Sequence, residues 1–276
     1  MFEKFSRSWS LVKASAAVLR SDKELLLFPV ISSFATLLVL ATFAVPMFAM
    51  NLLAGDFGLL HAVIGFAFYF CQYTVIIFFN CALVGAAMIR LDGGDPSLAD
   101  GLNIAKSRLG AILGYAAIAA TVGMILQAMK GKENNVVMRM IGSGLGVAWT
   151  LATFMVVPVL VSQNIGPIDA LKQSISLLKR TWGENAIGNV GIGAAFGLLM
   201  VLAIIVAVLL TIVASTLSMA LAITVAVLCI MGIVLMAVFQ AALSGVYSAA
   251  LYRYAVDGQA PAAFADMGLQ TAFQPK

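Results

Sequence analysis

The chain has 276 residues, of which 62% are hydrophobic and 10% are charged, and its formal net charge is +4. A soluble domain has about 45–50% apolar and about 25% charged residues, so this composition excludes an ordinary soluble fold. The mean hydropathy of +1.05 indicates instead an all-α polytopic membrane protein. The positive charge does not indicate nucleic-acid binding, because the basic residues lie between apolar runs and form no patch with interleaved aromatics.

The sequence offers no recognisable catalytic or metal-binding pattern. Its three cysteines, Cys71, Cys81 and Cys229, lie inside apolar runs without a CxxC pair, which argues against a disulfide framework or a zinc site. The single histidine, His61, begins an apolar run and is interpreted as an interfacial side chain. Hydrolase, P-loop and zinc-protease motifs are missing, so we expect no enzymatic activity, no cofactor and no metal.

The first predicted element is an amphipathic segment over residues 1–24. Apolar residues recur in it at steps of three and four, which puts them on one face of a helix: Phe2, Phe5, Trp9, Val12, Ala16 and Leu19. We expect Trp9 to anchor this helix at the membrane interface. The apolar run that follows is too long for a signal peptide and is read as a retained first span.

Charge-free runs predict six transmembrane helices, since a span needs about 20 apolar residues. We place the spans roughly at 27–50, 60–89, 109–129, 140–162, 187–213 and 220–251 of a single membrane domain. The last two share one run without charge between Asn185 and Tyr252, which is too long for one helix. We expect that run to turn near Ser215–Ser218, before a C-terminal tail at 253–276.

A cationic amphipathic helix is predicted between the fourth and fifth spans, within Gln163–Glu184. Gly166-Pro167 ends an incoming helix and Asp169 suits a helix cap. The apolar residues of this segment again follow three-four spacing: Ile168, Leu171, Ile175, Leu178 and Trp182. We expect Trp182, Lys179 and Arg180 to anchor the helix at the membrane surface.

A threefold internal repeat of surface helix, span and span is predicted. Polar closing residues after the second, fourth and sixth spans are each followed by glycine, proline and aspartate, in the order Arg90, Gly93, Pro96, Asp100; Gln163, Gly166, Pro167, Asp169; and Arg253, Gly258, Pro261, Asp266. The copies are 1–90, 91–163 and 164–253. Chance remains the alternative, because apolar runs punctuated by Gly, Pro and Asp are common.

Glycines at i and i+4 allow helix backbones to approach each other. Such pairs occur near the start of three predicted spans, at Gly110/Gly114, Gly142/Gly146 and Gly193/Gly197. The fifth span also carries Gly188 and Gly191. We therefore expect the fifth span to be a central, tightly packed helix.

The predicted spans contain no charged residue, which argues against a proton relay or a carboxylate ion site. Neutral polar residues remain, and Asn80, Gln240 and Gln72 are our candidates for substrate-binding or pore-lining positions. Hydrogen bonding between helices is the alternative interpretation of each.

The N-terminal run from Phe5 to Ser32 resembles the opening of an uncharacterised bacterial and archaeal family of six-span integral membrane proteins, a domain of unknown function. The resemblance is carried by Trp9, Lys13, Ala14, Ser15, Leu19, Asp22-Lys23-Glu24-Leu25-Leu26 and Pro29. Over the rest of the chain it rests on length and hydropathy. It implies a six-span protein of the prokaryotic cytoplasmic membrane and implies no catalytic or binding residue.

Lysine and arginine counts in the connecting segments place both termini and the surface helices in the cytoplasm. Surface helices without intramembrane charge favour a structural or accessory subunit that binds lipid, a protein partner or further copies of itself. The alternative is a small-solute or lipid permease or channel.

Overall fold

The computed structural model describes residues 13–49, 58–130, 136–182 and 191–258. Within these ranges the chain is helical and contains no strand. Residues 13–21 are helical, and a short 3-10 helix η1 (Lys23–Leu26) leads into the first long helix. The helices that follow are α2 (Leu27–Ala49), α3 (Leu59–Leu91), α4 (Leu98–Ser107), α5 (Leu109–Lys130), α6 (Val136–Thr153), α7 (Val156–Ser162), α8 (Pro167–Trp182), α9 (Gly191–Leu217) and α10 (Met219–Asp257).

Six of these segments are long and apolar enough to cross a membrane, as the sequence predicted. They are Lys23–Phe48, Leu59–Leu91, Leu109–Met129, Ile141–Ser162, Gly197–Leu217 and Met219–Asp257. The turn between the last two consists of Ser218, whose hydroxyl caps α10 by accepting the Leu221 N–H at 3.1 Å. α2 continues through Pro46, which lies in its last turn, to Ala49.

The order of the elements is a short helix followed by two spans, three times over. The short helices are 13–21, α4 and α8, and the second span of each set ends in α3, α7 or α10. The predicted repeat requires this order. Whether the three sets arose by duplication stays a prediction.

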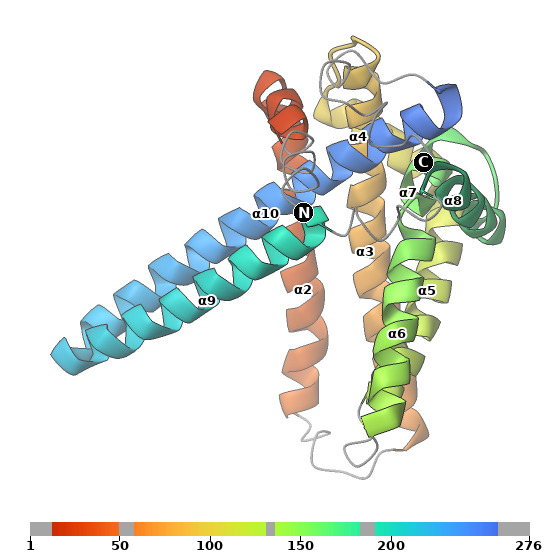
Figure 1. Ribbon diagram of the computed structural model, residues 1–276. Coiled ribbons are helices and arrows are strands. Elements are labelled where there is room, and N and C mark those ends of the chain that lie inside the picture. The colour runs from red at the N-terminus through yellow and green to blue at the C-terminus, as the bar shows by residue number, and fades with distance from the viewer. Residues whose placement is uncertain (1–12, 50–57, 131–135, 183–190, 259–276) are drawn as a thin grey trace.

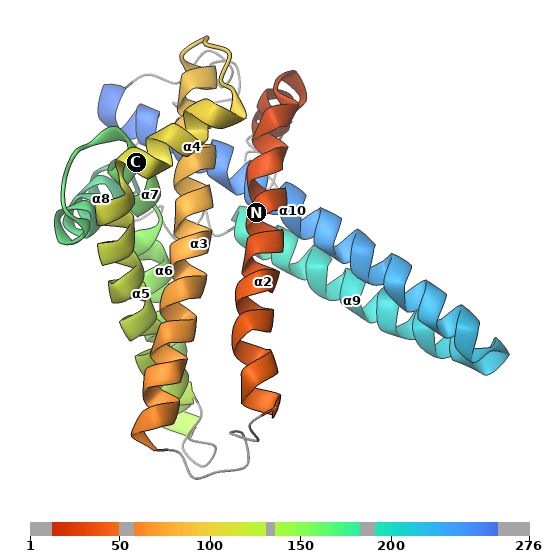
Figure 2. The ribbon, with the colours of Figure 1, turned by 180° about the vertical axis from the view of Figure 1, so that it is seen from behind.

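The long helices diverge from one end of the molecule (Figure 1). α2, α3, α5 and α6 run side by side, whereas the α9–α10 hairpin points obliquely away from them, and the view from behind shows the same arrangement (Figure 2). The core is concentrated where the groups meet, in residues 81–88 of α3, residue 155 with 156–161 of α7, and residues 242–252 of α10. We call these three segments the junction.

The prediction that the fifth span is central is wrong. α9 packs mainly against α10. In its most apolar stretch of 18 residues only 6% of the residues are buried, whereas in the corresponding stretch of α3 50% are buried. A Cβ on Gly197 would meet nothing within 4 Å, so this glycine allows no close approach. Gly188 lies outside the described residues.

Glycines do mediate close packing near the junction. A Cβ on Gly101 of α4 would lie 2.7 Å from the Ala82 carbonyl oxygen of α3 and would overlap the Phe28 ring. A Cβ on Gly114 of α5 would lie 2.8 Å from Cγ of Pro167, at the start of α8. Both positions need glycine because the neighbouring group is backbone or a rigid ring.

Candidate functional site

Nearly all described charge gathers at one end of the molecule. Of the charged residues in the described ranges, Lys130 and Arg139 flank the segment between α5 and α6, and the others lie at the end where α3, α7 and α10 close. This end also carries the helix at 13–21, α4 and α8 (Figure 1). It is therefore the candidate functional surface.

Four polar contacts link the segments at this end into a closed circuit, which we call the polar ring. Glu24 Oε2 accepts the Leu98 N–H at 2.9 Å, and Arg108 Nη1 donates to Asn164 Oδ1 at 2.6 Å. Gln163 Nε2 donates to the Tyr252 hydroxyl at 3.1 Å, and Arg253 forms an ion pair with Asp92. The ring thus connects all three sets of helices through contacts between residues far apart in the sequence.

The junction lies beneath the polar ring and brings together the ends of three spans. Met88 of α3 accepts a hydrogen bond on Sδ from the Ser162 hydroxyl of α7 at 3.3 Å. The two similar sequences AAMIR (86–90) and AALYR (249–253) both contribute to the buried core, in α3 and α10. Their small alanines allow the helices to approach closely.

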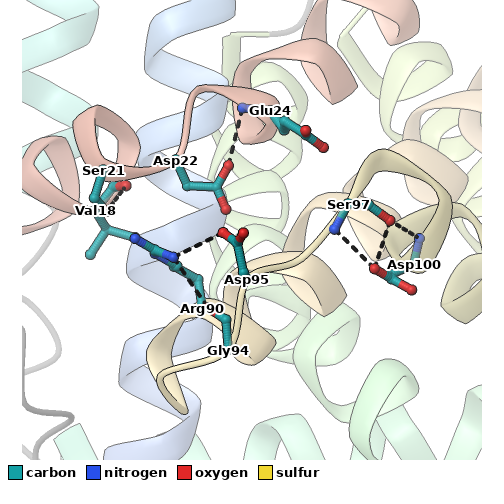
Figure 3. Close-up of polar contacts among 9 residues, drawn as sticks. All are labelled: Val18, Ser21, Asp22, Glu24, Arg90, Gly94, Asp95, Ser97 and Asp100. Atoms are coloured by element: carbon teal, nitrogen blue, oxygen red, sulfur yellow. Dashed lines mark hydrogen bonds and ion pairs between the residues drawn. The ribbon is translucent and has the colours of Figure 1, made fainter.

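The turn after α3 is fixed by local contacts, as Figure 3 shows. Gly93 has φ +86°, a left-handed conformation that glycine adopts without strain. Arg90 Nη1 donates to the Gly94 carbonyl and to Asp95 Oδ1, both at 3.2 Å. The turn therefore also positions a cation, the Arg90 guanidinium.

A capping box starts α4. Asp100 Oδ2 accepts the Ser97 hydroxyl at 2.6 Å and the Ser97 N–H at 2.9 Å, while the Asp100 N–H donates to Ser97 Oγ at 3.3 Å. The Ser97 hydrogen bonds lower the pKa of the Asp100 carboxyl, because they stabilise its ionised form. Asp100 is thus a structural residue of the turn.

Asp22 is a buried carboxyl at the edge of this site (Figure 3). Its Oδ1 accepts the Glu24 N–H at 3.1 Å and caps η1, while its Oδ2 is enclosed without a hydrogen-bond partner within the described residues. Only 6% of the residue is exposed. Burial raises the pKa of Asp22, and the nearby Arg90 charge opposes that rise.

The fourth predicted span is broken into α6 and α7. Pro158 lacks an N–H and its ring disfavours the preceding helical turn, which accounts for the interruption at Phe154. Ser174 of α8 compensates at the break: its hydroxyl donates to the Ala152 carbonyl at 2.6 Å and accepts the Met155 N–H at 3.1 Å. Ser174 is completely buried, and it joins a surface helix to an interrupted span.

The predicted pore-lining residues are not brought together by hydrogen bonds. Asn80 and Gln72 lie on α3 and Gln240 on α10, all half-buried, and no side-chain hydrogen bond joins them within the described chain. Gln72 Oε1 is enclosed without a partner, as is the hydroxyl of Thr74 on the same helix. Their role in binding or conduction stays a prediction.

The predicted role of the anchors at a membrane surface stays a prediction. Lys179 is exposed on α8. Trp182 and Arg180 belong to α8, but the positions of their side chains lie outside what the structure describes, and Trp9 lies outside the described residues. His61 accepts the Gly58 N–H on Nδ1 at 3.4 Å at the start of α3, and its interpretation as an interfacial side chain stays a prediction.

Sequence reasoning missed three features of this site: the Pro158 break with Ser174, the contact from Glu24 to α4, and the Arg253–Asp92 pair. Pro158 was a visible signal, because proline inside an apolar run predicts an interruption. The long-range pairs had no local signal, since their partners are separated by 74 and 161 positions.

Comparison with known proteins places the chain without assigning an activity. No curated protein matches it. A family model described as "Family of unknown function (DUF6159)" matches residues 59–262, which cover most of the candidate spans but not the N-terminal run on which the sequence resemblance was based. The chain belongs to this family of unknown function.

Proposed function

We propose that this protein is a membrane-embedded structural or accessory subunit whose charged end binds a lipid or protein partner. The observation that carries the proposal is the polar ring, which fixes three sets of helices into one platform. The described spans contain no charged residue between their ends, so the charged end is the part that offers polar recognition.

The proposed setting is the cytoplasmic membrane of a prokaryote, with both termini and the charged end in the cytoplasm. The concentration of lysine and arginine at that end supports this orientation. Lys130 and Arg139, which lie at the opposite end, argue against this orientation. We propose no catalytic role, because the sequence carries no catalytic motif.

The test is to extract the full chain from membranes directly into polymer nanodiscs and to determine which proteins the extracted complex contains. We expect native mass spectrometry to give one defined stoichiometric complex, either a closed oligomer or a complex with a partner. Asp95→Lys should weaken that complex, because the Asp95 side chain is 96% exposed beside the ring. Lys130→Glu at the opposite end is the matched control and should leave it intact. A strictly monomeric protein without a partner would overturn the proposal.

A permease or channel for small solutes or lipids is the second candidate. The enclosed, unpartnered Gln72 Oε1 and Thr74 hydroxyl on α3 favour it, because buried polar groups without partners are costly and a polar ligand would satisfy them. Solute flux into proteoliposomes should then fall when Gln72, Asn80 or Gln240 is replaced by leucine. Flux that is unaffected by all three substitutions removes these residues from the pathway.

A further inference from the structure

α8 has three different faces around its axis: one that packs on the protein, an apolar stripe, and a side with two lysines. Successive residues of an α-helix are rotated by about 100°, so residues three and four apart share a face. The face that packs on α5, α6 and α7 is formed by Ala170, Ser174 and Leu177, which are all buried. Ser174 fastens this face to the break between α6 and α7.

Only one edge of the apolar stripe of α8 packs on the protein. By helical rotation, Leu178 and Leu171 lie about 70° and about 90° from the centre of the packed face, whereas Ile175 and Ile168 lie about 130° and about 150° from it. Ile168 is 58% exposed and Ile175 is half-buried, whereas Leu171 and Leu178 are partly buried and pack against the core. The edge of the stripe formed by Ile168 and Ile175 is therefore left facing outward, and an apolar environment must cover it.

Two lysines border the stripe on the side away from the protein. Lys179 and Lys172 lie about 20° and about 40° around the helix from Ile168. Both are exposed: Lys172 approaches Asp169 at 3.5 Å, and Lys179 makes no ion pair with a described residue. Such side chains extend their ammonium groups toward a polar phase while their stems cover apolar surface.

The depth of α8 agrees with a position at the membrane interface. α7 has seven residues between the break and Ser162, a rise of about 10 Å along the span. Because Ser174 contacts the break itself, the middle of α8 lies that far along the span from its polar end. Interfacial helices lie with their apolar faces about 5–10 Å into the boundary between headgroups and acyl chains.

We infer that α8 binds anionic phospholipid in the leaflet at the charged end, with its stripe against acyl chains and Lys172 and Lys179 on the lipid phosphates. Charge complementarity selects this occupant, since the stripe is bordered by cations and lies beside membrane spans. The inference rests on the proposed function, in that it names the lipid class bound at the charged end.

The test places an environment-sensitive fluorophore on the stripe. In the full chain with Cys71, Cys81 and Cys229 replaced by alanine, Ile168→Cys carries the label, and Ser176→Cys on the exposed polar face is the matched control position. The labelled protein is placed in vesicles with one fixed ratio of phosphatidylcholine to phosphatidylglycerol. Two samples are compared. In one, the acyl chains of phosphatidylcholine carry bromine atoms that quench the fluorophore, and in the other the acyl chains of phosphatidylglycerol carry them.

We expect strong quenching at position 168 and weak quenching at 176. Per bromine atom, quenching at 168 should be greater with brominated phosphatidylglycerol, by about five-fold for each lysine that acts on the lipid. Lys172→Gln with Lys179→Gln should remove this preference and retain quenching by phosphatidylcholine. Lys106→Gln on α4 is the charge control and should keep the preference.

Equal quenching by the two lipids in the protein with native lysines would overturn the selection of anionic lipid. No quenching at position 168 by either lipid would mean that a second copy or water covers the stripe, and would overturn the inference entirely. The nanodisc experiment above reports on complex formation and is independent of the bromine label. Failure of the lipid site and failure of the proposed function are therefore distinguishable.

Discussion

α3 and α9 are both long, apolar helices, yet they occupy opposite situations in the molecule. Half of the residues in the most apolar stretch of α3 are buried, and the end of α3 forms part of the junction. α9 packs mainly on α10, and most of its described side chains are exposed. α9 is the more apolar of the two, with mean hydropathy 3.1 in its most apolar stretch against 2.0. Hydropathy therefore identifies a span, whereas specific close contacts determine which span is central.

Replacing a glycine with valine should show the largest difference between the packed region around α3 and the α9–α10 hairpin. Gly101→Val should destabilise the protein by about 2–3 kcal/mol or prevent folding, because the new side chain meets the Ala82 carbonyl and Phe28. Gly232→Val in α10 is the matched control, since nothing lies within 4 Å of its Cβ position. Thermal unfolding in detergent measures both, and equal losses would remove the distinction.

Removing the hydroxyl at the helix break should have the next largest effect. Ser174→Ala leaves the Met155 N–H and the Ala152 carbonyl without their side-chain partner and should cost about 1–3 kcal/mol. Ser176→Ala, two residues along the same helix and exposed, should change stability by less than about 0.5 kcal/mol. A Ser174 variant as stable as the Ser176 control would mean that the break is stabilised in another way.

The Arg253–Asp92 pair should make a smaller contribution. Its side chains are 33% and 55% exposed, and pairs of this kind contribute about 0.2–1 kcal/mol. A double-mutant cycle with Arg253→Gln and Asp92→Asn should give a coupling energy in that range that falls as salt is added. The Lys172–Asp169 pair within α8 should couple more weakly because both side chains are more exposed. A coupling energy of zero would remove this link from the polar ring.

Asp22 should give the smallest effect, detectable through its pH dependence. Because burial raises its pKa from 3.8, the folded protein retains a proton that the unfolded chain has lost, and stability falls as the pH rises above that value. Asp22→Asn keeps an oxygen to cap η1 and cannot ionise. The variant should therefore gain stability relative to the native chain as the pH is raised from about 4 toward neutrality. A constant difference across this range would contradict the burial effect.

Much of the fold could be predicted from the sequence, because each span is a local property of composition. The ends of the spans and the turn at Ser218 follow from the placement of charge and from where Gly, Pro and Ser interrupt the runs. The order of short helix and two spans was also visible, since Gly166-Pro167 and the turn at Gly93 punctuate it.

The packing could not be predicted in the same way. The apolar stripe of α8 is plain in the sequence, but the protein packs on a neighbouring face built of Ala170, Ser174 and Leu177. Small and hydroxyl side chains carry little hydrophobic signal, although they permit the closest approach of helices. The glycines of the fifth span led to the wrong prediction that this span is central. A spacing of glycines does not show whether a partner helix lies opposite them.

Cross-linking tests the junction, which is the central claim, most directly. In the cysteine-free chain, Met88→Cys with Ser162→Cys should be joined rapidly by a short thiol cross-linker in membranes, because those side chains lie 3.3 Å apart. Ile76→Cys on α3 with Ile205→Cys on α9, both exposed, should not be joined within one molecule. Failure of the first pair together with intramolecular cross-linking of the second would place α9 in the centre and contradict the account.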